Sequence, residues 1–194
     1  KGLAERNVKA DLVIWPLRYA VTADDLATLQ RLSDDSEAKL RAFLGQRFPG
    51  DDVSVSAPQI QDRNAQGMSD RGGNLQRFVA EVTVTLRTQR IDEVRKSNEL
   101  LGELVKAGVA LVQNYESRTQ YSYTGLDKVK PEMIAEATRD ARQAAEQFAK
   151  DSGSKVGSIR NAQQGYFSIE DRDAFSPESK AIRVVTTVQF FLED

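Results

Sequence analysis

Hydrophobic and polar residues alternate over the first twenty positions, which is typical of β-strands. The apolar residues from Val8 to Ile14 fall on one parity, whereas from Trp15 onwards they fall on the other. Because proline cannot donate a hydrogen bond to a neighbouring strand, Pro16 indicates a bulge or an edge position that swaps the buried face there. We therefore predict two short strands, or one bent strand, over residues 2–21.

Apolar residues at helical spacing predict three helices. Thr22 to Asp25 offers a hydroxyl N-cap followed by a carboxylate, and the helix that it begins should end near Pro49-Gly50. A second helix is predicted from Ile91 to Gly108. In the third, Lys130-Pro131 places proline where a first turn tolerates it, and the helix should end at Ser152-Gly153. The apolar stripe of the third helix comprises Ala137, Ala141, Ala144 and Phe148.

The other apolar segments predict strands, and the clearest of them covers residues 75–87. There, Phe78, Val82 and Leu86 lie on one face and charged or hydroxyl residues on the other. Segments rich in Asn, Gln, Gly and Asp separate the strands. The further strands are predicted at residues 53–62, 109–123, 155–162 and 181–192, and polar loops at residues 63–74 and 166–179.

This order of elements predicts an α+β fold. We expect a mixed, largely antiparallel sheet with three helices packed mainly on one side, built from strand-helix-strand units. No linker divides the chain, so residues 1–194 are predicted to form a single domain, with two possible sub-lobes at about 1–125 and 126–194. Since the sequence begins at Lys1 within a predicted strand, we expect an N-terminal signal or membrane anchor to precede it.

Composition restricts the chemistry more than it restricts the fold. The 194 residues include no cysteine and no histidine, which excludes thiol nucleophiles and histidine-based acid–base catalysis. The formal net charge of -2 provides no general attraction to nucleic acid. We therefore predict a protein that is not an enzyme, with no catalytic residues, no metal site, no cofactor and no nucleic-acid partner.

Aromatic residues mark one possible ligand cleft. Aromatic side chains commonly line small-molecule pockets, and Trp15, Tyr19, Tyr115 and Tyr121 are candidates to share one. The same residues also suit half-buried strands, which is the alternative interpretation.

Two segments resemble a known family. The opening residues, KGLAERNVKADL, are similar to the G-x-(A/G)-E-x-x-V-x-x-D pattern that begins the bacterial SIMPL domain. Residues 141–157, ARQAAEQFAKDSGSKVG, resemble the helix-to-strand segment A-R-x-x-A-E-x-x-A-x-x-x-G-x-x-(L/V)-G of the same family. The order of elements agrees with this family from end to end.

The resemblance implies an exported protein of unknown function in the periplasm or cell envelope, similar to periplasmic immunogenic proteins. Residues 124–137 resemble the subgroup with an uncleaved N-terminal anchor in the inner membrane. The family is associated with envelope and oxidative stress, and some members form ring-like oligomers. The sequence thus predicts a non-enzymatic envelope domain that mediates self-assembly or protein interaction, as a homo-oligomer or with an envelope protein. The alternative is a periplasmic domain that binds a small molecule or peptide in the aromatic cleft.

Overall fold

A computed structural model describes residues 1–65, 75–113 and 117–193 of the protein. The fold is α+β with antiparallel sheets, which confirms the predicted class. Contacts between residues divide the chain into two compact units. Unit 1 comprises residues 1–11 and 121–194, and unit 2 comprises residues 12–120. The single domain with lobes near 1–125 and 126–194 stays a prediction.

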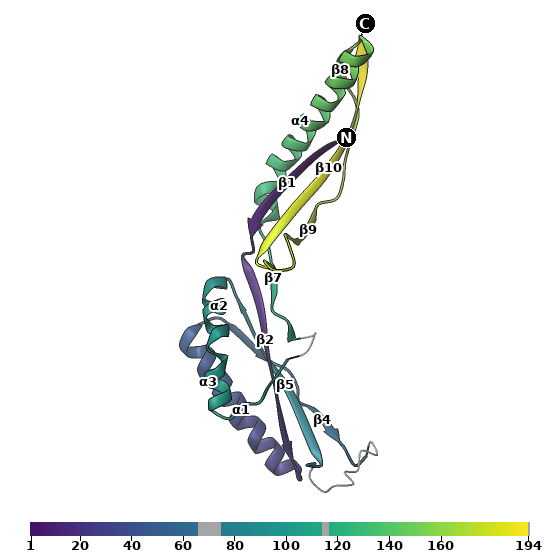
Figure 1. Ribbon diagram of the computed structural model, residues 1–194. Helices are drawn as coiled ribbons and strands as arrows, with labels where there is room; N and C mark the ends of the chain where they lie inside the picture. The colour runs from purple at the N-terminus through teal and green to yellow at the C-terminus, as the bar shows by residue number, and fades with distance from the viewer. Residues whose placement is uncertain (66–74, 114–116, 194) are drawn as a thin grey trace. The chain divides into compact units, whose positions relative to one another are not determined.

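Unit 1 is an antiparallel sheet with a long helix along one face (Figure 1). β10 (Ser179–Glu193) is the central strand, with β1 (Gly2–Lys9) on one side and β8 (Lys155–Gln164) on the other. β9 (Ser168–Asp171) also pairs with β10, inside the segment predicted to be a polar loop. The helix, α4 (Leu126–Ser152), packs against β1 and β10.

The core of unit 1 forms where alternate strand residues meet small and apolar residues of α4. Ala4, Ile182 and Val184 pack against Met133 and Ala137, and all five are almost fully buried. The small side chains of α4 allow its backbone to approach β1 closely, which is the packing expected from the predicted stripe of alanines. The stripe is confirmed at Ala137 and Ala141.

Two details of the third helix differ from the prediction. Phe148 is 79 % exposed rather than part of the buried stripe. Ala137 and Ala141 lie over Gly2, where β1 begins. The later turns of α4, which include Phe148, therefore extend beyond the end of β1 and do not pack against it. Pro131 lies inside α4 rather than in its first turn, because the helix begins earlier, at Leu126.

Unit 2 is built on a long antiparallel strand pair. β2 (Leu12–Ala23) pairs with β5 (Phe78–Thr88) over most of their length. β3 (Asp52–Val55) and β4 (Gln59–Asp62) pair with the other edge of β5. β6 (Leu111–Val112) pairs with the other edge of β2. The predicted strand over residues 53–62 is therefore two strands, since Ser56 to Pro58 interrupt it.

Three helices lie on one side of the β2–β5 pair in unit 2 (Figure 1). They are α1 (Leu26–Arg47), α2 (Ile91–Glu99) and α3 (Leu101–Lys106). The predicted second helix is thus broken at Leu100 into α2 and α3. The predicted strand over residues 109–123 is reduced to β6 and to β7 (Gln120–Ser122), while residues 114–116 lie outside the described part.

The buried face changes between β1 and β2, not at Trp15-Pro16. Gly2 and Ala4 are buried in β1, whereas the odd-numbered residues from Val13 to Tyr19 are buried in β2. The change of parity falls at Ala10-Asp11, where the chain passes from one sheet to the other. The predicted swap at Pro16 is therefore wrong.

The other part of that interpretation, an edge position for Pro16, is correct. Ala20 donates its N–H to the carbonyl of Ala110, so the even-numbered residues of β2 direct their N–H groups to the β6 edge. β6 opposes only Arg18 and Tyr19. Pro16 lies beyond the end of this short ladder, where its lack of an N–H costs no hydrogen bond to β6.

The first helix begins in the predicted segment but with a different cap. The carboxylate of Asp25 accepts a 2.9 Å hydrogen bond from the backbone N–H of Thr28, and Thr22 is still part of β2. This bond favours the ionised carboxylate and lowers the pKa of Asp25. α1 ends at Arg47, as Pro49-Gly50 predicts.

We predict that Gly2→Ala destabilises unit 1. A Cβ at Gly2 would lie 1.9 Å from the carbonyl oxygen of Ala137 and 2.3 Å from the nitrogen of Ala141, so strand and helix must separate. The expected loss in the free energy of unfolding is about 1–3 kcal/mol, measured by urea denaturation. Gly45→Ala is the matched control, since its Cβ meets nothing within 4 Å in α1. Equal stability of the Gly2→Ala variant and the unsubstituted protein would contradict the close packing.

Candidate functional site

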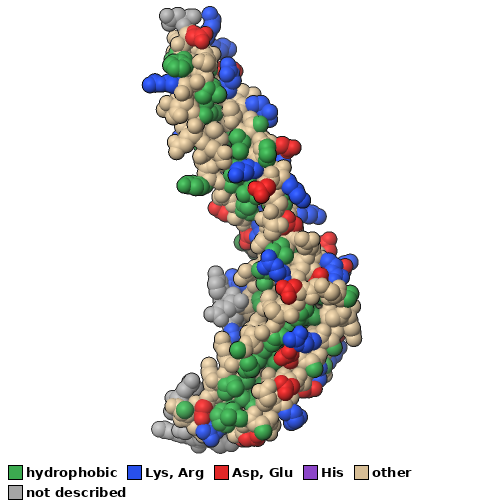
Figure 2. All heavy atoms as spheres, turned by 180° about the vertical axis from the view of Figure 1, so that it is seen from behind, with side chains coloured by type: hydrophobic (Ala, Val, Ile, Leu, Met, Phe, Trp, Pro, Cys, Tyr) green, Lys and Arg blue, Asp and Glu red, His purple; other side chains and the backbone are tan. Residues whose placement is uncertain are grey.

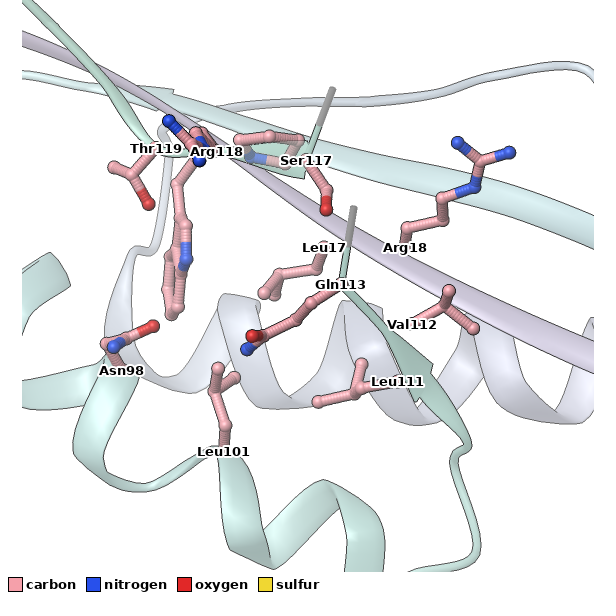
Figure 3. A pocket seen from close by; sticks show the side chains of 12 residues that line it. Leu17, Arg18, Asn98, Leu101, Leu111, Val112, Gln113, Ser117, Arg118 and Thr119 are labelled. Atoms are coloured by element: carbon pink, nitrogen blue, oxygen red, sulfur yellow. The ribbon is translucent and has the colours of Figure 1, made fainter. Parts of the chain in front are cut away.

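A pocket in unit 2 lies along the edge of β2 that β6 covers only in part (Figure 3). Its volume is ≈ 470 Å³, within the range of small-molecule sites. The ladder between β2 and β6 is two residues long, and β7 also pairs with β2, while residues 114–116 between β6 and β7 lie outside the described part. Apolar side chains form much of the wall: Trp15, Leu17, Leu101, Leu111 and Val112.

The polar side chains of the pocket come from α2 and from the segment after β6. Figure 3 shows the amides of Asn98 and Gln113 directed towards the space around Leu101. Neither amide has a hydrogen bond to another described residue. Ser117, Arg118 and Thr119 complete this polar part of the lining.

Arg18 also lines the pocket, but its charged group turns away from it. Figure 3 shows the side chain directed away from Leu17. Its guanidinium donates to the carboxylate of Glu81 on β5, and both side chains are partly buried. This ion pair joins the two long strands and neutralises the charge of Arg18.

Of the four aromatic residues predicted to share a cleft, the structure places Trp15 in this pocket. Trp15 is 2 % exposed, and its ring meets the ring of Phe48 edge-on, with 6.3 Å between the centroids. Tyr121 belongs to β7 and is not among the lining residues. Tyr115 lies outside the described residues.

Tyr19 belongs to the core rather than to the cleft. Its side chain is fully buried, and its hydroxyl donates to the carbonyl of Ser33 on α1 over 3.0 Å. Burial disfavours the phenolate and raises the pKa of Tyr19. The residue therefore joins α1 to β2, which is a structural role.

Sequence reasoning missed Asn98, Gln113 and Arg118. Two signals were available. One was the polar Asn98 beside the apolar stripe of the second predicted helix, a position that is usually just exposed. The other was Arg118 among tyrosines, a pattern that half-buried strands also show. The helix is broken at Leu100, so that Asn98 lies at the end of α2 and Leu101 at the start of α3. Both residues line the pocket.

Unit 1 presents a different surface, an open strand edge. β1 pairs with β10 from Ser179 to Thr186 only. Beyond Thr186, the rest of β10 has a described partner on the β8 side alone. We call residues 187–193 the open edge of β10.

Apolar side chains surround the open edge. Phe191 and Leu192 are 51 % and 65 % exposed, and Phe148 of α4 is also exposed. Ile159 of β8, which pairs with Phe190, is half exposed. Figure 2 shows green hydrophobic side chains among blue Lys and Arg side chains near the upper end of unit 1. An unpaired strand with such side chains is a template for pairing with another strand.

The shifted carboxyl pKa values of the described residues have structural causes. The pKa of Asp62 is lowered by hydrogen bonds from Arg77, across the β4–β5 pair. That of Asp173 is lowered by a hydrogen bond from the neighbouring Arg172. Neither carboxylate lines the pocket beside Trp15.

Comparison with protein families identifies the family of the chain. The model of the SIMPL family, described as a protein of unknown function (DUF541), matches residues 1–190. No curated protein matches the chain. Within the described residues, the helices are too short or too polar for any of them to cross a lipid bilayer.

We predict that the tryptophan fluorescence of the protein is blue-shifted and poorly quenched by acrylamide. Trp15 is the only tryptophan of the chain and is 2 % exposed, so water and quencher reach its indole rarely. Unfolding in guanidinium should restore both the red-shifted emission and the quenching. Strong quenching of the native protein would contradict the closed packing of Trp15 against Phe48.

Proposed function

Because the chain belongs to the SIMPL family, whose function is unknown, we propose its role from its own surface. The protein is a non-enzymatic interaction module of the cell envelope, and it pairs with a second copy of itself through the open edge of β10. The observation that carries this proposal is the group of exposed apolar side chains around residues 187–193 of β10, namely Phe191 and Leu192 with Phe148 of α4.

The open edge offers unpaired backbone groups in a known direction. Gly165 donates its N–H to the carbonyl of Val185, so the odd-numbered residues of β10 direct their backbone groups towards β8. The even-numbered residues direct theirs to the opposite side, which β1 occupies only up to Thr186. The N–H and C=O groups of Val188, Phe190 and Leu192 therefore point to the open edge.

The sequence of the open edge suits pairing with itself. In an antiparallel pair related by a two-fold axis, even-numbered residues oppose even-numbered ones. Val188, Phe190 and Leu192 then meet the same three side chains of the second copy, on the side of the sheet that faces α4. Cross-strand apolar pairs of this kind stabilise a sheet. A second copy is thus a complementary partner for this edge.

The β1 edge of the same sheet is protected, in contrast to residues 187–193 of β10. The backbone N–H of Leu3 on β1 donates to the carboxylate of Asp140 over 2.8 Å. Arg6, also on β1, forms an ion pair with Glu132 of α4. Charged groups and covered N–H groups are common means of preventing unwanted strand addition. The open edge of β10 has Phe191 and Leu192 instead.

The envelope location rests on the family resemblance, which implies export and a link to envelope or oxidative stress. The absence of cysteine is compatible with an oxidising compartment. The proposed partners are a second copy of the chain or another envelope protein, with no nucleic acid and no cofactor.

We predict a concentration-dependent dimer that substitutions at the open edge abolish. In light scattering across a concentration series, the mass should rise to twice that of the monomer. The double variant Phe191→Lys/Leu192→Lys should stay monomeric, because charged side chains oppose strand addition. Phe175→Lys is the matched control, since Phe175 is 97 % exposed and lies outside β10.

Two results would contradict this self-pairing. The first is a monomer at every concentration. The second is a double variant that dimerises as the unsubstituted protein does. Circular dichroism should show that all variants keep the same secondary structure.

We also predict that the protein, expressed from its full-length gene in a Gram-negative bacterium, is recovered with the periplasm or with the inner membrane. Fractionation after osmotic shock measures this distribution. Recovery with cytosolic marker enzymes would overturn the proposed location and leave the strand pairing untouched.

A further inference from the structure

We propose that a second pocket of unit 2, between α1 and β4, binds a small uncharged molecule that consists mostly of hydrocarbon. The first turns of α1 line this pocket together with Pro58, Ile60 of β4 and Ala80 of β5, and we call it the α1–β4 pocket. It shares no described lining residue with the pocket beside Trp15. Its role is also separate from the pairing of the open edge, since the described lining belongs to unit 2 and the open edge to unit 1.

The α1–β4 pocket exists because the sheet of unit 2 is wider than the helix that covers it. α1 packs mainly against β2 and β5, whereas β4 pairs with the other edge of β5. Ile60 opposes Ala80, so the two side chains lie on the same face of the sheet. Ala80 is buried with Leu29 of α1 on that face. The small side chain of Ala80 leaves a space between α1 and Ile60.

The shape and size of the pocket suit a small molecule rather than an element of a partner protein. Its floor is buried and comprises Leu29, Ser33 and Ala80, whereas Leu26 and Ile60 are half exposed at its rim. The volume is ≈ 240 Å³. A single turn of an α-helix, which is about 10 Å wide, needs more space than this. A molecule with one or two small rings, or a short hydrocarbon chain, fits.

The polar groups of the lining already have partners within the protein. The hydroxyl of Ser33 is hydrogen-bonded to that of Tyr19 over 3.1 Å, and the carbonyl of Ser33 accepts a bond from the same hydroxyl over 3.0 Å. The amide nitrogen of Gln30 donates to the carboxylate of Asp34 over 2.8 Å. These bonds leave the apolar side chains as the main contacts for a ligand.

The charge of the lining excludes ionic ligands. The described lining contains neither acidic nor basic side chains. A charged ligand would therefore lose its hydration without gaining an ion pair there, which is unfavourable. The transfer of hydrocarbon from water to the same place is favourable, and cavities lined by apolar side chains bind small hydrocarbons.

The test follows the δ1 methyl group of Ile60 by NMR while toluene is added. Benzoate and benzylammonium are charged analogues of similar size. We expect a saturable shift with toluene and an affinity at least about tenfold lower for both analogues. Ile159 is the internal control, because it lies in unit 1 and is 48 % exposed, against 49 % for Ile60. The proposal is overturned by no saturation at Ile60 up to the solubility limit of toluene, by the same response at Ile159, or by equal affinity for either analogue.

Variants assign the site. Leu26→Glu places a charge at the rim and should lower the affinity for toluene at least about tenfold. Leu26 is the first residue of α1, where an acidic side chain is compatible with the helix dipole, so the fold should be kept. Val105→Glu is the matched control, since Val105 is similarly exposed on α3 and does not line the pocket. Unchanged affinity in Leu26→Glu, or the same loss in Val105→Glu, would contradict the assignment. Unchanged Trp15 emission verifies that unit 2 is folded in each variant.

The neutral compound N-acetylphenylalaninamide distinguishes a free molecule from the side chain of a partner protein. It carries the same benzyl group as toluene but adds peptide groups, which the pocket has no room or free donors to accept. We expect it to bind at least about tenfold more weakly than toluene. Tighter binding than that of toluene would overturn the free molecule as the ligand and indicate an apolar side chain of a partner. Failure of any of these tests leaves the proposed strand pairing of unit 1 untouched.

Discussion

Backbone N–H and C=O groups need hydrogen-bond partners. Where two neighbouring strands differ in length, part of the longer strand has no such partner in the shorter one. In unit 1, the fifteen residues of β10 lie beside only eight of β1. In unit 2, β6 opposes two of the twelve residues of β2, and the three-residue β7 also pairs with β2. Among the described residues, each arrangement leaves part of the longer strand without a paired neighbour on one side. Both the open edge of β10 and the pocket beside Trp15 are consequences of this one constraint.

The unpaired part of the strand borders a pocket in unit 2 and an exposed edge in unit 1, because the two strands differ in sequence. In β2, Pro16 removes a donor, and the space beside it is closed by helices and by a polar segment, which suits a small ligand. In β10, every residue from Thr187 to Glu193 keeps its N–H, and Phe191 and Leu192 are exposed, which suits another strand. A missing donor thus favours a pocket, whereas a row of donors favours an interface.

The sequence predicted the elements whose signal is local. Alternation located β5 and β10, the alanine stripe located the packed face of α4, and Gly153 ends that helix with a positive φ as predicted. It did not predict the division of strands between two sheets, because pairing depends on partners distant in the chain. The same reason explains why the pocket residues Asn98 and Arg118 were missed, and why Phe148 was assigned to the core. Of the four aromatic residues predicted to share a cleft, Trp15 lines the pocket. The prediction failed for Tyr19 because alternation does not distinguish a strand residue in the core from one in a cleft.

The two ends of the chain together build unit 1, whereas the residues between them build unit 2. Gly2 pairs with Thr186, so β1 finds its partner only after the residues up to Thr186 have been synthesised. Unit 2 is continuous in sequence and can complete its β2–β5 pair earlier. Pairing between such distant segments is slow, and an unpaired strand is prone to aggregate while it waits. β1 therefore lacks its partner strand while the residues between the two strands are synthesised, which makes it a natural client for chaperones that bind extended segments.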